Sequence, residues 1–363
     1  MSRTRTSCLM ISVADRMTKL VKKLTVLKGC LLALFFVSGC TSGTPDEPLR
    51  FSGPIMGTNY NITVYAPERE QLVLETGIQR TLNRVVNSMS VYEPRSDISR
   101  FNEGEPDQWI EVSDEVAHVV AAGLDVAALT DGAFEPTILP LVNIWGFGPQ
   151  GRAEEIPADE AIEEAMARVG WEAVEVRQDP PALRKSADRE LDLAAIAKGY
   201  GADAVAEYLL DQGHSQFLIE LGGDMNIRGG RPDGTSWRIA IEKPDEIQWG
   251  IYRILEVDDA AIVTSGDYRS YFERGGVRYS HTIDPRIGRP VDHRLASVSV
   301  IAENSMLADA WATALTAMGP EEAKEVAEWE DLSVLLIERN DDGFVETATG
   351  EFIRLLAEED ERS

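Results

Sequence analysis

The segment "ADAWATALTAMG", residues 308–319, places one acidic side chain in an otherwise apolar predicted helix. Asp309 is the only charged residue between Met306 and Gly319, although 27% of the chain is charged. A carboxylate among apolar groups must be paired, bound to a cation or protonated, because its desolvation costs more than a hydrogen bond returns. The predicted helix contains no Lys or Arg, so it offers Asp309 no partner of its own.

Thr313 follows Asp309 at a spacing of four residues, which puts both side chains on one face of the helix. A carboxylate and a neutral hydroxyl are hard oxygen ligands, suited to Mg²⁺ or Ca²⁺. Alternatively, Asp309 lies near the helix N-terminus, after Asn304 and Ser305, and only complements the helix dipole. The spacing alone leaves both interpretations open.

Hydrophobic periodicity around this segment predicts helices and strands in mixed order. A hairpin is predicted over residues 268–284, with its turn at 274–276 and with Val277, Tyr279, His281 and Ile283 on one face. Interspersed elements with recurring hairpins indicate the α+β (mixed α/β) class, with hairpin-containing sheets flanked by helices. Helices are predicted over 68–89, 114–129, 202–211, 306–318 and 321–328, and strands over 60–66, 217–221, 237–242, 296–302 and 332–338.

The N-terminal 39 residues have the pattern of a signal peptide. Seven basic residues precede the apolar run "LLALFFV", which is too short to span a bilayer, and "VSGC" ends at Cys40. The cysteine after Gly39 resembles a bacterial lipoprotein signal, with Cys40 lipidated and residues 40–50 as a tether. The chain is therefore expected on the periplasmic side of a bacterial membrane, inner or outer, and residues 357–363 are expected to form an acidic tail.

Charge and composition exclude several classes of function. Removing residues 1–39 takes away seven basic residues and Asp15, leaving 28 Lys and Arg against 61 Asp and Glu, a net charge of −33. Nucleic acid is therefore not an expected partner. All three cysteines lie within the first forty residues, and the four histidines form no HxxxH pair, so neither a thiol nucleophile nor a zinc site is expected.

Three further segments carry candidate functional groups. In "LDLAAIAKGYGADAVAEYL", residues 191–209, Asp192 and Lys198 stand among small residues at a helix entrance, where backbone can approach a phosphate, or where a plain turn would serve equally. In "YSHTIDPRIGRPV", residues 279–291, His281 is a candidate general base or a structural strand histidine. Residues 131–149 combine glycines, prolines and aromatics, and form either a cradle for a flat ring or a rigid core loop.

Together with "MGT" at 56–58 and "SVYEPRSDISRFN" at 90–102, these segments resemble the ApbE family of FAD:protein FMN transferases. The resemblance covers roughly residues 51–340 and implies a single two-lobed domain, bounded at 51–356. It also rests on "GAFEPT" at 132–137, "LIELGGDM" at 218–225, "SGDYRSYF" at 265–272 and "LADAWATAL" at 307–315.

The resemblance assigns roles to residues by position. The divalent ion, Mg²⁺, would be held by Asp309, the hydroxyl of Thr313 and the backbone carbonyl of Ala195. Relatives commonly have Asp where this chain has Glu135, so the side chain that would contact FAD at this position is longer here. FAD would be contacted by Met56, Tyr92, Ala133, Phe134, Glu135, Asp192, Lys198 and Ile283.

The implied reaction is transfer of the FMN moiety of FAD to a threonine hydroxyl of an acceptor protein, with release of AMP. His281 is the candidate base, with Asp284 as an alternative base or as its orienting partner. By family analogy, the acceptors are flavoprotein subunits of Na⁺-pumping NADH:quinone reductase or related electron-transfer complexes. A Mg²⁺-dependent FAD pyrophosphatase and a non-catalytic FAD-binding lipoprotein remain the alternatives.

Overall fold

The computed structural model describes residues 47–149, 156–245, 250–266 and 271–362. The predicted signal peptide and Cys40 lie outside these residues. None of the described helices is both long enough and apolar enough to cross a membrane.

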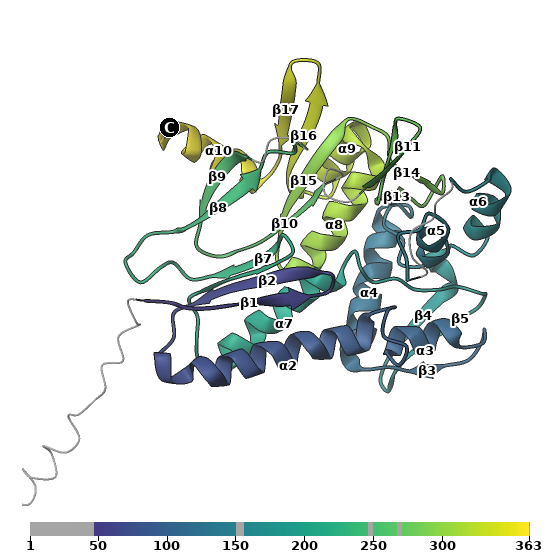
Figure 1. The fold of residues 1–363 in the computed structure, drawn as a ribbon, viewed down its shortest axis with the longest axis horizontal. Helices are drawn as coiled ribbons and strands as arrows, with labels where there is room; N and C mark the ends of the chain where they lie inside the picture. The colour runs from purple at the N-terminus through teal and green to yellow at the C-terminus, as the bar shows by residue number, and fades with distance from the viewer. Residues whose placement is uncertain (1–46, 150–155, 246–249, 267–270, 363) are drawn as a thin grey trace, which may run out of the picture. The chain divides into compact units, whose positions relative to one another are not determined.

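An antiparallel sheet of eight strands organises the described chain (Figure 1). Leu49 pairs with Val64 in the first hairpin. The sheet therefore begins before residue 50, the predicted end of the tether. Along the sheet the order is β1 (Leu49–Ile55), β2 (Thr58–Val64), β6 (Phe217–Leu221), β7 (Asp224–Arg228), β10 (Ala260–Gly266), β15 (Leu295–Ala302), β16 (Ser333–Asn340) and β17 (Gly343–Ala348).

Helices cover one face of this sheet. In the layer against the strands, α7 (Ala197–Asp211) packs on β6 and β7, and α8 (Ser305–Met318) packs on β10 and β15. Apolar side chains of these helices meet inward residues such as Val263, Val298 and Val300 in one buried core. Around them lie α2 (Gln71–Met89), α4 (Asp114–Leu129) and α9 (Pro320–Trp329).

A second core lies on the opposite face. Here β8 (Trp237–Glu242) and β9 (Ile251–Val257) form a hairpin that shares buried apolar residues with the sheet and with α10 (Glu351–Arg362). The predicted acidic tail is corrected by this helix, because residues 357–362 form its last turns. Glu359 accepts a hydrogen bond from the amide of Ile254 at 2.6 Å, and Asp360 pairs with Arg253 at 3.1 Å.

The remaining elements are short helices and strands outside the eight-stranded sheet and the β8–β9 hairpin. Most predicted boundaries are confirmed to within a few residues, and Ser113 caps α4. The predicted continuous strand through His281 is wrong, because β12 ends at Ser280 and Ile283 belongs to a separate two-stranded sheet. The elements are η1 (Glu68–Glu70), α3 (Asp97–Glu103), β3 (Ile110–Glu111), α5 (Leu139–Ile144), α6 (Asp159–Met166), η2 (Trp171–Ala173), β4 (Val174–Gln178), β5 (Pro181–Lys185), β11 (Tyr271–Arg274), β12 (Val277–Ser280), β13 (Ile283–Asp284) and β14 (Arg289–Pro290).

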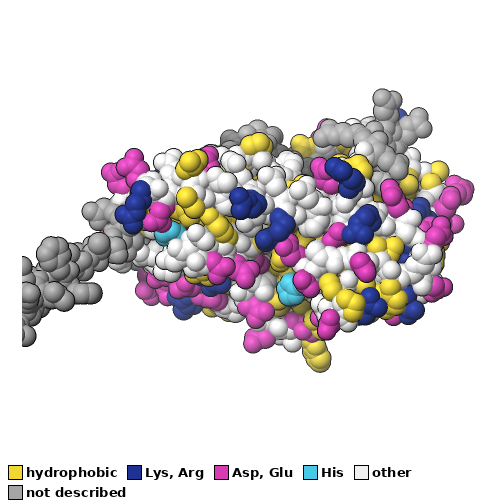
Figure 2. All heavy atoms as spheres, turned by 90° about the horizontal axis from the view of Figure 1, so that it is seen from below, with side chains coloured by type: hydrophobic (Ala, Val, Ile, Leu, Met, Phe, Trp, Pro, Cys, Tyr) yellow, Lys and Arg dark blue, Asp and Glu magenta, His cyan; other side chains and the backbone are white. Residues whose placement is uncertain are grey.

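Acidic side chains are spread over the face shown in Figure 2, with Lys and Arg interspersed among them. This distribution suits a solvated surface, in keeping with the excess of acids in the sequence.

The start of α7 corrects a predicted boundary, because the helix begins at Ala197 rather than at residue 202. Gly199 lies in its first turn, where an added Cβ would come within 2.1 Å of the Ser305 carbonyl oxygen. The glycine therefore lets the backbones of α7 and α8 approach closely. This approach brings Lys198 and Asp309 together.

We predict that Gly199→Ala destabilises the fold by about 1–3 kcal/mol, because the methyl group meets backbone that cannot move aside. Gly201→Ala is the matched control in the same helix, since its nearest neighbours, atoms of Leu221 and Met56, lie at 3.4 Å. The control should be neutral or stabilising by up to about 1 kcal/mol, the helix preference of Ala over Gly. Urea unfolding measures both, and equal midpoints would contradict the close approach.

Candidate functional site

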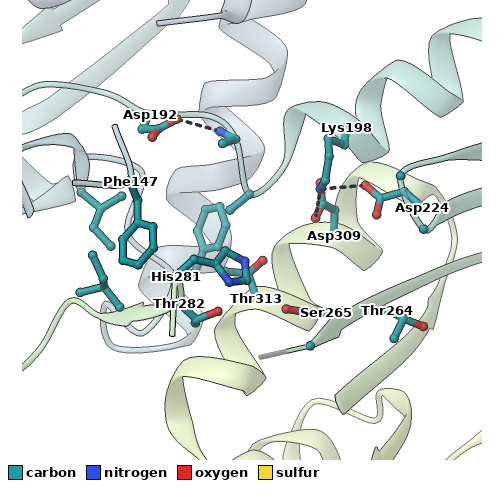
Figure 3. A pocket seen from close by; sticks show the side chains of 18 of the residues that line it. Phe147, Asp192, Lys198, Asp224, Thr264, Ser265, His281, Thr282, Asp309 and Thr313 are labelled. Atoms are coloured by element: carbon teal, nitrogen blue, oxygen red, sulfur yellow. Dashed lines mark hydrogen bonds and ion pairs between the residues drawn. The ribbon is translucent and has the colours of Figure 1, made fainter. Parts of the chain in front are cut away.

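A pocket of about 710 Å³ lies where the first turns of α7 and α8 meet the ends of β7 and β10. Its wall also includes the turn between β6 and β7, the loop before α7, the loop after β12 and residues between 133 and 147. Figure 3 shows Lys198, Asp224 and Asp309 clustered on one side and Phe147 and Asp192 on the other. The pocket thus has a charged part and a part with more apolar side chains.

Asp309 is buried, with 3% of its surface exposed, and it points into the charged part of the pocket. Both of its oxygens lie 3.1 Å from Nζ of Lys198, and Oδ2 also accepts a hydrogen bond from the amide of Gly199 at 3.2 Å. The dipole interpretation is insufficient, because Asp309 lies beyond the first turn of α8, where the helix dipole acts. The partner of Asp309 in this structure is a lysine of a neighbouring helix.

Asp224, at the start of β7, shares that lysine. Its Oδ2 lies 3.1 Å from Nζ of Lys198, and only 2% of the residue is exposed. The sequence signal for this acid is the Gly222–Gly223 turn directly before it, in which both glycines have positive φ angles of 63° and 106°. One ammonium group therefore faces two buried carboxylates, which leaves one negative charge uncompensated.

This arrangement shifts the pKa values of Lys198 and Asp224. Burial favours the neutral amine of Lys198, but Asp224 and Asp309 outweigh burial and hold the pKa of Lys198 well above its usual range. Burial and the charge of Asp309 raise the pKa of Asp224 well above 3.8, against the opposing effect of Lys198. The cluster therefore favours any additional positive charge.

The proposed metal ligands meet in this pocket. Thr313 and Ala195 line it together with Asp309. The described residues hold no group of three or more His, Cys, Asp or Glu side chains arranged for a metal. Mg²⁺ needs no such group, because it binds through one or two carboxylates, retains waters and takes further oxygens from substrate phosphates. A net negative charge, a hydroxyl and a carbonyl fit that ion.

His281 and Asp284 have different surroundings. His281 lines the pocket and is exposed. The side chain of Asp284 accepts two hydrogen bonds at 3.0 Å from the guanidinium of Arg286, and the residue is not part of the pocket wall. Arg286 therefore contacts both oxygens of Asp284, and the role of Asp284 as a base or as the partner of His281 stays a prediction.

The predicted FAD contacts are brought together with one exception. Tyr92, Ala133, Phe134, Glu135, Asp192 and Ile283 line the pocket with Lys198. Met56 is not among the lining residues, and its side chain packs between two core clusters beside α7. The contact of Met56 with FAD stays a prediction.

Glu135 and Asp192 are both held by protein donors. Glu135 accepts hydrogen bonds from the hydroxyl and amide of Thr137, at 2.7 and 2.8 Å, and from the amide of Trp171 at 3.1 Å. Burial nevertheless raises the pKa of Glu135. Asp192 accepts a hydrogen bond from the amide of Ala194 at 3.0 Å, and burial raises the pKa of Asp192. Both acids shape the loops of the pocket wall.

A family model described as "ApbE family" matches residues 56–336. The chain belongs to the ApbE family. A relative named "FAD:protein FMN transferase" from Vibrio cholerae serotype O1 is 42% identical over 334 residues, covering 90% of this chain and 98% of the relative. The relative of that name from Escherichia coli (strain K12) is 36% identical over 337 residues, covering 90% and 96%.

Solved ApbE structures share the fold. "Flavin Transferase ApbE from Vibrio cholerae" superposes with a TM-score of 0.79 at 41% identity, covering 86% of this chain and 100% of that one. The apo form of Pseudomonas stutzeri flavinyl transferase ApbE gives a TM-score of 0.77 at 39% identity, covering 85% and 97%. The mixed helix and strand class is confirmed, and this ApbE-family chain is an enzyme of the transferase class.

Several residues of this ApbE pocket were not predicted as site residues. Besides Asp224 they include Glu220, Phe147, Thr264, Ser265 and Thr282. Glu220 has a visible function, because its carboxylate accepts from the amide of Gly223 at 2.8 Å and from Asn61 at 2.6 Å, which fixes the turn before Asp224. These residues come from separate strands and loops, and no local spacing pattern connects them.

We predict that Asp224→Asn gains stability relative to the wild type as pH rises above about 4. The unfolded carboxyl group loses its proton near 3.8, whereas the native group retains it to higher pH. The native wild type therefore binds more protons over that window, and its stability falls as pH rises. The asparagine has no proton to lose, so the difference between the variants should widen.

Urea unfolding with a chelator, at about pH 4 and about pH 7, measures this difference. Asp188→Asn is the control, because the Asp188 side chain is 63% exposed and outside the pocket wall. A difference between Asp224→Asn and wild type that stays constant with pH would contradict the raised pKa of Asp224.

Proposed function

We propose that this ApbE-family protein transfers the FMN moiety of FAD to a threonine hydroxyl of an acceptor flavoprotein subunit, releases AMP and requires Mg²⁺. The observation that carries this proposal is the arrangement of Lys198, Asp224 and Asp309 in a pocket that also has an apolar wall. The relatives named FAD:protein FMN transferase support the same activity. A dinucleotide with a flat ring system and a charged diphosphate matches both parts of the pocket.

The apolar wall suits the flavin ring, because Phe134, Phe147 and Ile283 line it. The carboxylate of Asp309, the hydroxyl of Thr313 and the carbonyl of Ala195 would hold the ion. Bound Mg²⁺ would neutralise charge on the diphosphate, where negative charge builds up as the bond to AMP breaks. Lys198 supplies a second positive charge on the same side of the pocket, and Asp224 holds it there.

The reaction breaks one phosphorus–oxygen bond and forms another. The threonine oxygen attacks the phosphorus of the FMN half, the bridging oxygen leaves with AMP, and the threonine proton passes to a base. His281 is the candidate, because an imidazole accepts protons near neutral pH and because it is exposed where an acceptor protein can reach it.

The acceptors we propose are subunits of Na⁺-pumping NADH:quinone reductase or related electron-transfer complexes. The N-terminal pattern supports a lipid anchor at Cys40 and a location on the periplasmic side of a bacterial membrane. The acidic charge of the chain argues against attraction to an anionic membrane, so a stable attachment depends on that lipid.

One observation favours a second activity. The exposure of His281 also admits water, which would convert FAD to FMN and AMP with the same site residues. Mg²⁺-dependent FAD pyrophosphatase activity is therefore the competing function.

We predict that protein lacking residues 1–39, mixed with FAD, Mg²⁺ and an acceptor domain, produces a fluorescent flavin adduct that survives denaturation. Asp309→Ala is the matched control, and it should form no adduct because the ion and Lys198 lose their shared partner. Gel fluorescence and mass spectrometry measure the adduct. Free FMN that accumulates equally with and without acceptor would establish the pyrophosphatase, and unchanged FAD in both would indicate a binding protein.

We also predict that His281→Ala retains FAD binding but slows transfer by about 10²-fold, the usual contribution of a general base. Transfer rates and FAD affinity are measured on the same preparation. The control is His293→Ala, since the His293 ring lies outside the pocket wall and contacts the Thr316 carbonyl oxygen at 2.8 Å. Transfer by His281→Ala at the wild-type rate would remove His281 from the reaction.

A further inference from the structure

A third carboxylate lies next to the site but outside the pocket wall. Asp203 is on α7, one turn after Gly199, and it joins three segments of the chain. Its Oδ1 accepts hydrogen bonds from Nδ2 of Asn226 at 2.8 Å and from the amide of Ser305 at 2.9 Å. Its Oδ2 accepts from the amide of Met306 at 2.8 Å. No cation is among the hydrogen-bond partners recorded for it within the described chain.

The hydrogen bonds of Asp203 join the same elements that carry the charged residues of the pocket. Asn226 follows Asp224 by two residues, so both side chains lie on the same side of β7. Ser305 precedes Asp309 by four residues, so both lie on the same face of α8. The elements that carry Lys198, Asp224 and Asp309 are thus the same three elements that meet at Asp203.

The bonds to α8 fix where that helix begins. The first amides of a helix have no partner inside it and must be satisfied from outside. The side chain of Asn304 accepts a hydrogen bond from the amide of Leu307. Asp203, on the neighbouring helix α7, accepts hydrogen bonds from the amides of Ser305 and Met306. The hydroxyl of Ser305 also donates to the carbonyl of Met225 at 3.1 Å, which ties the same point to β7.

The orientation of Asn226 shows how strongly this contact is preferred. Asn226 is 2% exposed, and its Oδ1 has no hydrogen-bond partner among the described residues. A buried amide oxygen without a partner costs free energy. The Asn226 side chain nevertheless directs its Nδ2 group toward the carboxylate of Asp203.

We propose that Asp203 is a positioning residue for flavin transfer: by joining α7, β7 and the start of α8, it holds Asp309 and Asp224 on either side of Lys198. The inference rests on the proposed function for its kinetic consequence. Asp203 is not among the residues that line the pocket, and it acts through Asp309. Its carboxylate is required because two acceptor oxygens face three donors, which an amide side chain cannot match.

The test compares Asp203→Asn with Asp203→Glu. Asp203→Asn turns a donor toward one of the three N–H groups, and at saturating Mg²⁺ we expect kcat to fall by about tenfold or more while KM for FAD changes by less than about threefold. Asp203→Glu keeps two acceptor oxygens and should recover part of kcat. Circular dichroism and Tm establish that each variant is folded.

A second readout needs no acceptor protein. Asp203→Asn should raise the Mg²⁺ concentration required for half-maximal FAD binding by about tenfold, measured by FAD fluorescence. In an Asp309→Ala background, the same substitution should cause no further loss of FAD affinity, because Asp203 acts through Asp309. A residue that only stabilises the fold would lower affinity equally in both backgrounds.

Asp97→Asn is the matched control. The Asp97 carboxylate likewise accepts a backbone amide, that of Ser113 at 2.7 Å, ahead of α4 and away from the pocket wall. Wild-type kcat and wild-type FAD binding in Asp203→Asn would overturn the proposal. A loss of kcat matched by Asp97→Asn at an equal drop in Tm would also overturn it.

Failure of the proposed function is distinguishable from failure of this inference. If the wild type transfers no FMN, the proposed function fails, and the FAD-binding comparison still decides the role of Asp203. If Asp203→Asn does not fold, Asn226→Ala replaces it, because it removes one donor and leaves both contacts to α8. Unchanged Mg²⁺ dependence in Asn226→Ala would then overturn the proposal.

Discussion

The site depends on one constraint: a single lysine ammonium lies between two buried carboxylates. Asp224 and Asp309 lie on different elements, and each is 3.1 Å from Nζ of Lys198. Two carboxylates this close repel each other strongly in a poorly hydrated environment, and one ammonium only partly compensates them. The fold has to hold these charges in place, and the close backbone approach at Gly199 is what makes the three-way contact possible.

This constraint explains why α7 includes residues that are typical of a turn. Gly199 and Gly201 are typical of loops, yet both lie inside the helix. Glycine is required at 199 because a neighbouring backbone occupies the space of a side chain, which is a tertiary reason that local propensity cannot reveal. The same limitation affects α10, whose acidic residues resemble a free tail until Arg253 and the amide of Ile254 are placed beside them.

The sequence predicted the site residues whose chemistry conflicts with their surroundings. Asp309 stands out because no other charge lies near it in an apolar helix, and Lys198 because small residues surround it. Asp224 did not stand out, because an acid after two glycines is an ordinary turn. Its role became visible only when β7 was placed beside α7. Asp284 shows a further limit, since its position near His281 in sequence does not reveal that Arg286 contacts both of its oxygens.

The charge of the site also determines how it can bind an anionic substrate. A cluster with one uncompensated negative charge, in a chain with a net charge of −27, repels a diphosphate. A divalent cation would reverse the sign of that interaction, because Asp309 and Asp224 would attract it and it would in turn attract the diphosphate. Each ligand then strengthens the binding of the other by the same factor, as linkage requires. The geometry of two acids around one lysine therefore suits a site that is completed jointly by a metal ion and a dinucleotide.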